Sequence, residues 1–324
     1  MQIFRVENTS IKYITIVALI LVMFSSCTKV NKEMSFSLWK EQIREKALKD
    51  GITDETFTLS FADVKLSNSY KKIDNKQYHR KQSFADYYQN HVNNLRIKKA
   101  KKLQIDLDNN LANTEEKFNV PKGYILALWG IETDFGSISG NYYVIEALAN
   151  LAYNTRRKEF FEAELLTALK MINNNEVTIE QFRGSWAGAN GQCQFMPSSY
   201  YKYAYDGNND GKKNIWNNQD DIIASIANYL STLNWDSKVP WGYEVTIKKD
   251  RNPSQKAIKL AKLTTQGLIR IDGIAFTDYE LRQNVKILKL DNKTYITFNN
   301  FDILRDWNNS NYFAATVGIL AEKI

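Results

Sequence analysis

The chain has 324 residues, of which 44% are hydrophobic and 13% aromatic, enough to bury a substantial core in one large domain or two ordinary ones. The formal net charge is +7, and a positive charge draws a protein to anionic polymers. The lysines are dispersed, however, and the sequence contains no zinc-finger, RNA-recognition or basic-zipper pattern. These observations argue against nucleic-acid binding.

The N-terminus resembles the signal sequence of a bacterial lipoprotein. Arg5 and Lys12 precede an apolar run over residues 13–24, which is too short for a membrane span of ~20 residues and has the length of a signal-peptide core. Two serines then precede Cys27, as in a lipobox, although Phe24 stands where leucine is usual. The alternative is an ordinary signal peptide or an uncleaved anchor.

We therefore expect a signal peptide over residues 1–26, lipidation of Cys27 and a short tether over residues 27–35. The protein would then be lipid-anchored on the periplasmic side of a bacterial membrane, for which the outer membrane is our expectation. If Cys27 carries lipid, Cys193 has no partner, and the fold must rest on its hydrophobic core instead of disulfides.

The remaining chain, residues 36–324, reads as mainly helical. Helical apolar spacing begins at Phe36, residues 65–82 are polar and predict a loop, and a long helical segment is expected from about Ser83 to Phe118. Pro121 suits the first turn of the following helix. Further helices are predicted at residues 141–154, 158–174, 220–235 and 312–324. Residues 185–200 are rich in glycine and serine and predict a structured loop followed by a helix.

A small β element is predicted late in the chain. Residues 286–298 read as a hairpin that turns at Asp291, Asn292 and Lys293. We expect a helical core over about residues 84–240, with residues 241–324 completing the same catalytic region.

Glu132 stands out in the stretch "GYILALWGIETDFGS", an apolar helix that carries one carboxylate in its last turn. Leu128 and Trp129 share its helix face, and no basic residue lies within four positions. Desolvation in such surroundings keeps a carboxyl group protonated near neutral pH, which a general acid for glycosidic cleavage requires. The ordinary alternative is a half-exposed glutamate at a helix end.

Three separated motifs resemble the family of membrane-bound lytic murein transglycosylase B: "IETDFGSISG", "GSWAGANGQCQFMPSSY" and "DGNNDGKKNIWNNQDD". The segments "NTRRKEFFEAEL" and "ILRDWNNSNYFAATVGIL" extend the resemblance from about Phe36 to the C-terminus. It implies a lysozyme-like, mainly α-helical fold with a deep cleft. It also implies cleavage of the bond between N-acetylmuramic acid and N-acetylglucosamine in peptidoglycan, without added water, to leave a 1,6-anhydro ring.

The resemblance also implies roles for individual residues. Glu132 would be the catalytic acid. The other implied site residues would contact the glycan or its stem peptide, and they are Ser185, Gln194, Tyr229, Arg156, Arg157 and Asn308. Their hydroxyl, amide and guanidinium groups suit sugar hydroxyls, acetamido groups and carboxylates. Structural explanations stay open, namely a solvated helix start for the arginines and a core position for Tyr229. Two departures from the family pattern, Asn190 and Cys193, flank Gln194.

A calcium loop is a further expectation. Asp206, Asn208 and Asp210 stand at positions 1, 3 and 5 of an EF-hand-like loop, but position 12 is Asn217 instead of glutamate. Asp220 matches the acid that the resembled family uses in a slightly longer loop. The ion would be structural, and the alternative is an Asn/Gly-rich turn with no metal. No organic cofactor is expected.

Two other functions remain open at this point. A water-using peptidoglycan hydrolase needs a second carboxylate, for which Asp134, Glu162 and Glu164 are the candidates in the sequence. A wall-binding lipoprotein without catalysis is the other alternative. The expected partners are peptidoglycan glycan strands and, through the lipid, a membrane. We expect a monomer that is able to join a wall-remodelling complex.

Overall fold

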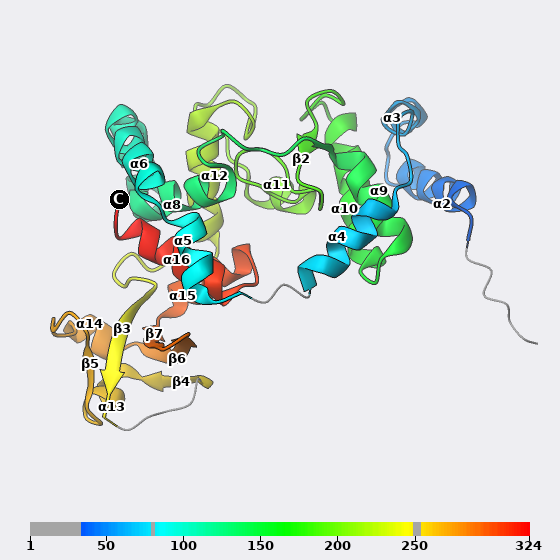
Figure 1. The fold of residues 1–324 in the computed structure, drawn as a ribbon. Coiled ribbons are helices and arrows are strands. Elements are labelled where there is room, and N and C mark those ends of the chain that lie inside the picture. Colours follow the sequence, from blue (N-terminus) through cyan, green and yellow to red (C-terminus); the bar gives the residue numbers. More distant parts are fainter. Residues whose placement is uncertain (1–33, 79–81, 249–253) are drawn as a thin grey trace, which may run out of the picture. The chain divides into compact units, whose positions relative to one another are not determined.

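A computed structural model of the chain describes residues 34–78, 82–248 and 254–324 (Figure 1). Contacts divide the chain into two units, residues 1–42 and 43–324. Helix α2 (Phe36–Lys49) begins in the first unit, where the rings of Phe36 and Trp39 stack with their centroids 5.4 Å apart. The expected signal peptide and Cys27 lie outside the described residues. Among the helices that the structure describes, none is long and apolar enough to cross a bilayer.

The first group of helices in the second unit packs around α9 and α10, which contact each other along their lengths. Helix α4 lies against α9, and helices α3 and α11 lie against α10. The bounds of this group are α3 (Asp54–Ser60), α4 (Asn68–Tyr78), α9 (Val144–Asn154), α10 (Lys158–Asn173) and α11 (Pro197–Tyr203). A two-stranded sheet of β1 (Tyr142–Tyr143) and β2 (Arg183–Gly184) adjoins α9.

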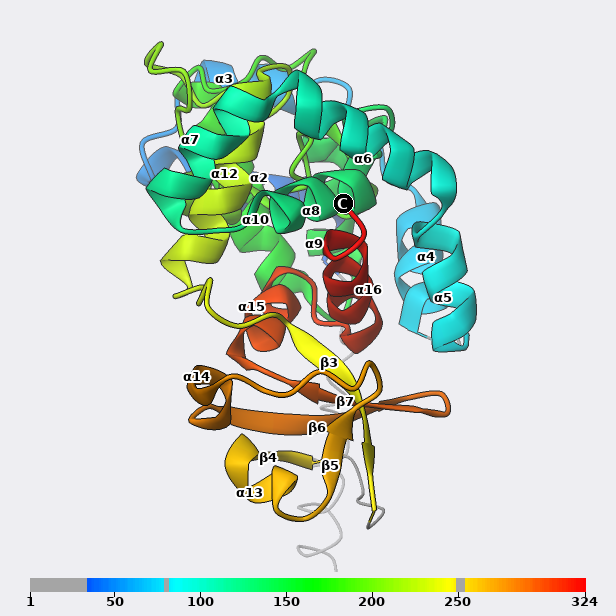
Figure 2. The same cartoon turned by 90° about the vertical axis from the view of Figure 1, so that its left-hand side faces the viewer.

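The second group of helices surrounds α8, which is buried continuously from Tyr124 to Gly130. Helix α8 packs against α6, α7, α12 and α16, and α16 also contacts α5 and α15 (Figure 2). The bounds are α5 (Phe84–His91), α6 (Asn94–Asp106), α7 (Asp108–Phe118), α8 (Lys122–Thr133), α12 (Gln219–Thr232), α15 (Asn299–Trp307) and α16 (Asn311–Ala321). An apolar helix enclosed on so many sides is a rigid support for a side chain at its end.

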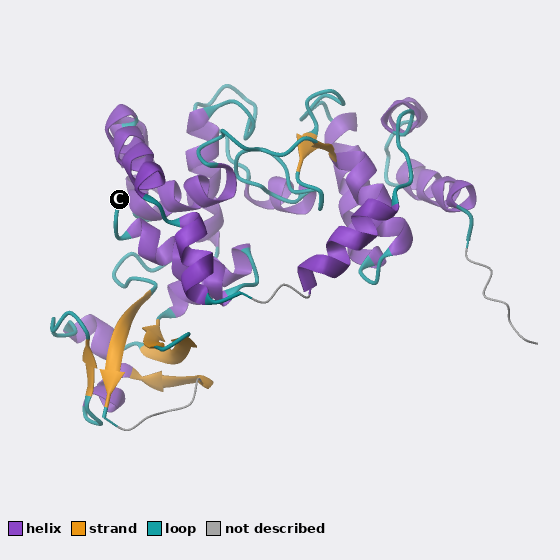
Figure 3. Cartoon of the chain, viewed as in Figure 1, coloured by secondary structure: helices purple, strands orange, loops and turns teal. Residues whose placement is uncertain are grey.

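The strands after β2 that the structure describes form one antiparallel sheet late in the chain (Figure 3). Its strand order is β4-β6-β7-β3-β5. The bounds are β3 (Gly242–Ile247), β4 (Ser254–Lys259), β5 (Leu268–Arg270), β6 (Asn284–Leu290) and β7 (Lys293–Thr297), with the short helices α13 (Leu260–Thr264) and α14 (Asp278–Leu281) between them. A hydrophobic cluster that includes Val245, Leu263 and Ile296 forms the core of this region.

The mainly helical fold and the hairpin at Asp291 and Asn292 are confirmed. Two expectations about elements were wrong, and the late β element has more strands than the hairpin alone. Residues 65–82 contain α4, whose buried side chains are Tyr70 and Asp74, one turn apart. Because a buried position of α4 is occupied by the carboxylate Asp74, the apolar spacing that would predict a helix is absent from the sequence. The segment expected as one long helix is broken into α5, α6 and α7, since the side chain of Asn93 caps a new helix. The late β element is a five-stranded sheet. The strands outside the predicted hairpin are short and partly polar.

Candidate active site

Glu132 lies in the last turn of α8, where the chain reverses sharply. Asp134 and Phe135 both adopt left-handed backbone conformations, with φ of 49° and 57°. The ring of Phe135 folds back over Gly130, where an added Cβ would lie 2.7 Å from the ring. Only glycine allows that approach, so the packed helix on one side and the tight turn on the other fix the position of Glu132.

The carboxyl group of Glu132 accepts a hydrogen bond from the side chain of Trp307, whose indole Nε1 lies 2.8 Å from Oε1. Burial raises the pKa of Glu132 to about 8, and the Trp307 hydrogen bond opposes part of that rise. A carboxyl group with this pKa is largely protonated at neutral pH. Glu132 can therefore donate a proton to a leaving oxygen.

Aromatic rings hold Trp307 in place. Its ring centroid lies 4.5 Å from that of Tyr229 and 5.3 Å from that of Phe195. Tyr229 in turn packs on Tyr203 at 4.3 Å and is only 6% exposed. The structure thus puts Tyr229 beneath the tryptophan that bonds Glu132, in a supporting position.

Ser185 and Gln194 shape the loop between β2 and α11. The hydroxyl oxygen of Ser185 accepts the backbone N–H groups of Ala187 and Ala189, at 3.3 and 3.1 Å. Gln194 has a left-handed φ of 49°. Its Nε2 donates to the carbonyl oxygens of Gly191 and Ser139, at 3.0 and 3.1 Å. Gln194 therefore ties this loop to the segment that follows Glu132.

The two departures from the family pattern, Asn190 and Cys193, point into the protein. Both are fully buried. The Asn190 side chain donates to the carbonyl oxygen of Phe195 at 2.9 Å. The Cys193 sulfur lies 3.6 Å from the carbonyl oxygen of Ile222. Burial, followed by the charge of Glu132, raises the pKa of the Cys193 thiol. These residues are internal braces of the loop beside Glu132.

The three candidates for a second carboxylate are each engaged elsewhere. The carboxylate of Asp134 pairs with Arg96 and Lys99 of α6, each at 3.2 Å. Glu162 pairs with Lys46. Glu164 is buried and accepts the N–H and hydroxyl of Ser198, at 2.9 and 2.6 Å, where α11 begins. Charge pairing and helix capping account for all three.

The remaining predicted site residues lie on the surface. Arg156 and Arg157 are exposed, and Arg157 bonds the buried Asp74 of α4 at 2.7 Å. Its guanidinium also covers the Phe161 ring at 4.7 Å. Asn308 is exposed at the C-cap of α15, directly after Trp307. Of these three, only Asn308 is next to a residue that touches Glu132.

Sequence reasoning missed Trp307 and Tyr87. Trp307 lies inside a segment that was matched to the family, but its indole donor gave no signal of its own. Burial, with the charge of Glu132 as the second cause, raises the pKa of Tyr87 of α5 to about 12. The Tyr87 ring stacks on His91 at 4.1 Å and lies 5.9 Å from that of Tyr312. An aromatic residue paired with histidine one turn later was the available signal.

The loop predicted to bind calcium is closed by hydrogen bonds to its own backbone. The Asp206 carboxylate accepts the N–H groups of Asp210 and Gly211, at 3.2 and 2.8 Å. Asn208 and Asp210 also bond each other through their side chains, at 3.0 Å. Oxygen side chains of this kind suit Ca²⁺.

The two acids at the end of this loop, Asp220 and Asp221, accept hydrogen bonds from different parts of the protein. Asp220 accepts a hydrogen bond from Asn110 of α7. The buried Asp221 instead closes the loop, accepting the N–H groups of Gly207 and Asn214 at 2.8 and 2.6 Å. Within the described ranges, no three acidic, histidine or cysteine side chains converge as a metal site. The ligand chemistry therefore fits calcium, but the acids are not gathered around one point.

The chain is similar to known proteins in family, sequence and structure. The model of the transglycosylase SLT domain family matches residues 35–322. Membrane-bound lytic murein transglycosylase B of Escherichia coli K12 is 31% identical over 218 residues. That alignment covers 64% of this chain and 58% of the relative, so it spans less than two thirds of the relative's length.

Solved structures share the fold over most of the chain. SltB3 from Pseudomonas aeruginosa, in complex with NAG-NAM-pentapeptide, matches with a TM-score of 0.85 and 31% identity, covering 89% of this chain and 79% of that one. Escherichia coli Slt35 in complex with calcium matches with a TM-score of 0.78 and 25% identity, over 88% and 91% of the two chains. The lysozyme-like fold class and the resemblance read from the motifs are both confirmed, and the chain belongs to the transglycosylase SLT domain family.

Proposed function

We propose that the protein is a lytic transglycosylase. It would cleave the β-1,4 bond between N-acetylmuramic acid and N-acetylglucosamine in peptidoglycan and leave 1,6-anhydro ends. The observation that carries this proposal is the carboxyl group of Glu132, whose pKa burial raises to about 8. The three acids considered as its partner are all engaged elsewhere. Solved relatives with bound NAG-NAM and NAG-anhNAM pentapeptides support the same substrate class.

The chemistry needs a single acid that becomes a base. Protonated Glu132 gives its proton to the glycosidic oxygen, and the bond from that oxygen to C1 of the muramic sugar breaks with the electron pair leaving on oxygen. The 6-hydroxyl of the same sugar attacks the oxocarbenium-like C1. The Glu132 carboxylate takes the hydroxyl proton and is thereby regenerated. No water enters, so a second carboxylate is not required.

Ser185 and Gln194 would orient the acetamido group of the muramic sugar. Gln194 donates through Nε2 to two backbone carbonyls, so its Oε1 is the atom suited to accept an acetamido N–H. The Ser185 oxygen accepts two backbone N–H groups, which leaves its own proton for the acetamido oxygen. A group held in one orientation next to C1 favours capture within the sugar. Asn308, beside Trp307, and the exposed Arg156 and Arg157 are proposed contacts for the rest of the glycan and its stem peptide.

Product analysis tests this function. Purified peptidoglycan is digested in ¹⁸O-labelled water with the protein and with Glu132→Gln, which keeps the shape but removes the acid. The expected products are anhydro-ended muropeptides, lighter by one water than hydrolysis products and without ¹⁸O. The variant should be slower by ~10²–10⁴-fold. Reducing ends that carry ¹⁸O would identify a hydrolase, and binding without cleavage would identify a wall-binding protein.

We also propose how the protein is placed in the cell. Residues 1–26 would be a signal peptide, Cys27 would carry lipid, and residues 27–35 would tether the catalytic region to the periplasmic side of the outer membrane. The membrane-bound E. coli relative supports this arrangement. The catalytic region would comprise residues 36–324 and act as a monomer or within a wall-remodelling complex.

Weak binding of Ca²⁺ by the loop of residues 206–220 is a further part of the proposal. The oxygen side chains of Asp206, Asn208 and Asp210 are close neighbours, and Slt35 was solved with calcium. Recruiting Asp220 would require it to leave Asn110. The role of the ion would be to stabilise the loop.

A further inference from the structure

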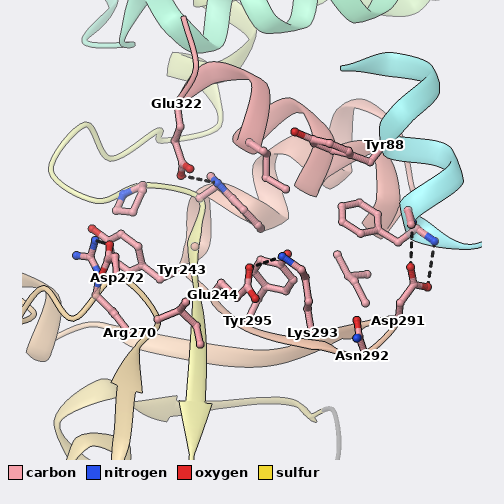
Figure 4. A pocket seen from close by; sticks show the side chains of 18 of the residues that line it. Tyr88, Tyr243, Glu244, Arg270, Asp272, Asp291, Asn292, Lys293, Tyr295 and Glu322 are labelled. Carbon is pink, nitrogen blue, oxygen red and sulfur yellow. Dashed lines mark hydrogen bonds and ion pairs between the residues drawn. The ribbon is translucent and has the colours of Figure 1, made fainter. Parts of the chain in front are cut away.

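A cavity of about 860 Å³ lies between α5, the end of α16 and the sheet (Figure 4). Phe84 and Tyr88 of α5 line it, one helical turn apart. The lining includes none of Glu132, Trp307, Ser185 and Gln194. The cavity is therefore separate from the candidate active site.

Aromatic side chains form much of the cavity wall. Trp241 and Tyr295 are buried beneath it, and Tyr88 and Tyr243 are partly exposed. The Arg270 guanidinium lies over the Tyr243 ring at 3.7 Å. Flat apolar surfaces of this kind suit the C–H faces of sugar rings.

The cavity lining contains two pairs of oppositely charged side chains. Lys293 bonds Glu244 at 2.7 Å across neighbouring strands. Arg270 bonds Asp272, with Nε 3.0 Å from Oδ1. Each pair leaves lone pairs and N–H groups for a ligand, while its net charge is zero. With Asp291, Glu322 and Lys323 included, the lining carries a formal net charge of about −1, which disfavours a polyanion and suits an uncharged, hydroxyl-rich ligand.

Two further contacts make the cavity a fixed feature of the fold. The Trp241 indole donates to Oε1 of Glu322 at 2.9 Å, which leaves Oε2 as an acceptor at the edge of the cavity. The Asp291 carboxylate accepts the backbone N–H groups of Phe84 and Ala85, at 3.1 and 2.9 Å. The turn between β6 and β7 thereby caps α5 and holds one wall against the other.

We propose that this cavity is a second saccharide-binding site, which holds one or two sugar units of a glycan away from Glu132. The saccharide class follows from the aromatic walls and the paired charges of the cavity itself. That the sugar is an N-acetylated amino sugar rests on the proposed function. Such a site would keep the protein on a glycan strand between cleavage events.

Two tryptophan side chains allow both sites to be followed in one experiment. The indole N–H of Trp241 bonds Glu322 at the cavity, and that of Trp307 bonds Glu132. The full-length protein with Glu132→Gln is labelled with ¹⁵N and titrated with N,N′,N″-triacetylchitotriose. Both indole signals should shift, and each should follow its own binding curve.

Variants of the cavity separate the two responses. Tyr88→Ala removes an aromatic wall, and Lys293→Met removes one partner of an exposed pair with little risk to folding. Each should weaken the Trp241 response at least tenfold and leave the Trp307 response unchanged. Gln89→Ala, an exposed change on α5 outside the cavity lining, should alter neither response.

The results of these titrations decide between the second saccharide site and its alternatives. An unmoved Trp241 signal at millimolar chitotriose, or an unchanged response in both variants, would overturn the second site. A Trp241 response to a free stem tripeptide but not to chitotriose would overturn the saccharide class. A shift of Trp241 without a shift of Trp307 would support the cavity site while counting against the proposed function.

Discussion

The indole nitrogen of Trp307 lies 2.8 Å from Oε1 of Glu132, although the two residues are 175 positions apart in the chain. The contact joins the last turn of α8 to the last turn of α15. Burial raises the pKa of Glu132, and this hydrogen bond is the contact that lowers it. Trp307 therefore adjusts the pH range over which Glu132 can act as an acid.

Trp307→Phe should move the pH profile of cleavage. The wild-type rate should fall as pH rises through about 8, where Glu132 loses its proton. Loss of the hydrogen bond destabilises the carboxylate, so the alkaline limb should move upward by on the order of one pH unit, with a lower maximal rate. Trp235→Phe is the matched control, since its buried indole nitrogen has no protein partner in the part of the chain that the structure describes. An unmoved limb would contradict this role.

Glu132→Gln should stabilise the fold, and increasingly so at higher pH. The native carboxyl group titrates at about 8 instead of 4.5. Between these values the unfolded chain has lost the proton while the native protein still holds it, so wild-type stability falls as pH rises through this window. The difference in the free energy of unfolding between the variant and the wild type, measured by chemical denaturation, should widen from pH 5 to pH 8, by at most about 1.4 kcal/mol per pH unit. The exposed Glu159→Gln should show no such trend, and a constant difference for Glu132→Gln would indicate an ordinary pKa.

Asp134→Asn should lower stability slightly and spare catalysis. Its carboxylate pairs with Arg96 and Lys99 at a partly exposed site, and pairs of this kind contribute roughly 0.2–1 kcal/mol. Cleavage should stay within tenfold of the wild type, and the products should keep their anhydro ends. A loss as severe as that of Glu132→Gln would make Asp134 a second catalytic carboxylate.

Calcium should raise the melting temperature if the loop at residues 206–220 binds it, because a ligand that binds only the folded state stabilises it by mass action. Millimolar Ca²⁺ should have this effect on the wild type but not on the double variant Asp206→Ala and Asp210→Ala. Mg²⁺ at the same concentration serves as the ionic control. A wild-type protein indifferent to calcium would indicate a turn that holds itself by hydrogen bonds alone.

Cys27→Ala should abolish lipid attachment. Metabolic labelling with a fatty-acid probe, followed by membrane fractionation, should show label and membrane association in the wild type and neither in the variant. Cys193→Ala is the control, since that thiol is buried in the fold. Equal labelling of the Cys27→Ala protein would reject the anchor.

The sequence was informative where function depends on local pattern. The apolar helix that carries Glu132 in its last turn and the loop around Gln194 are both legible from neighbouring residues. The contact between Trp307 and Glu132 could not be read from the sequence, since no periodicity links residues on α8 and α15. The ion pair between the buried Asp74 and the exposed Arg157 concealed α4 for a related reason. A charge that is satisfied from a distant segment looks like a surface residue in its own segment.

The burial of Cys193 has a practical consequence. A chain beginning at residue 34 contains this one cysteine, and its thiol is enclosed, with its pKa raised by burial. Maleimides and methanethiosulfonates react with accessible thiolates, so the folded protein offers a quiet background for labelling. Single cysteines introduced at exposed positions such as Leu95 and Ile138 would carry spin or fluorescent probes selectively. Distances between such probes would follow α6 and the segment after Glu132 as glycan binds.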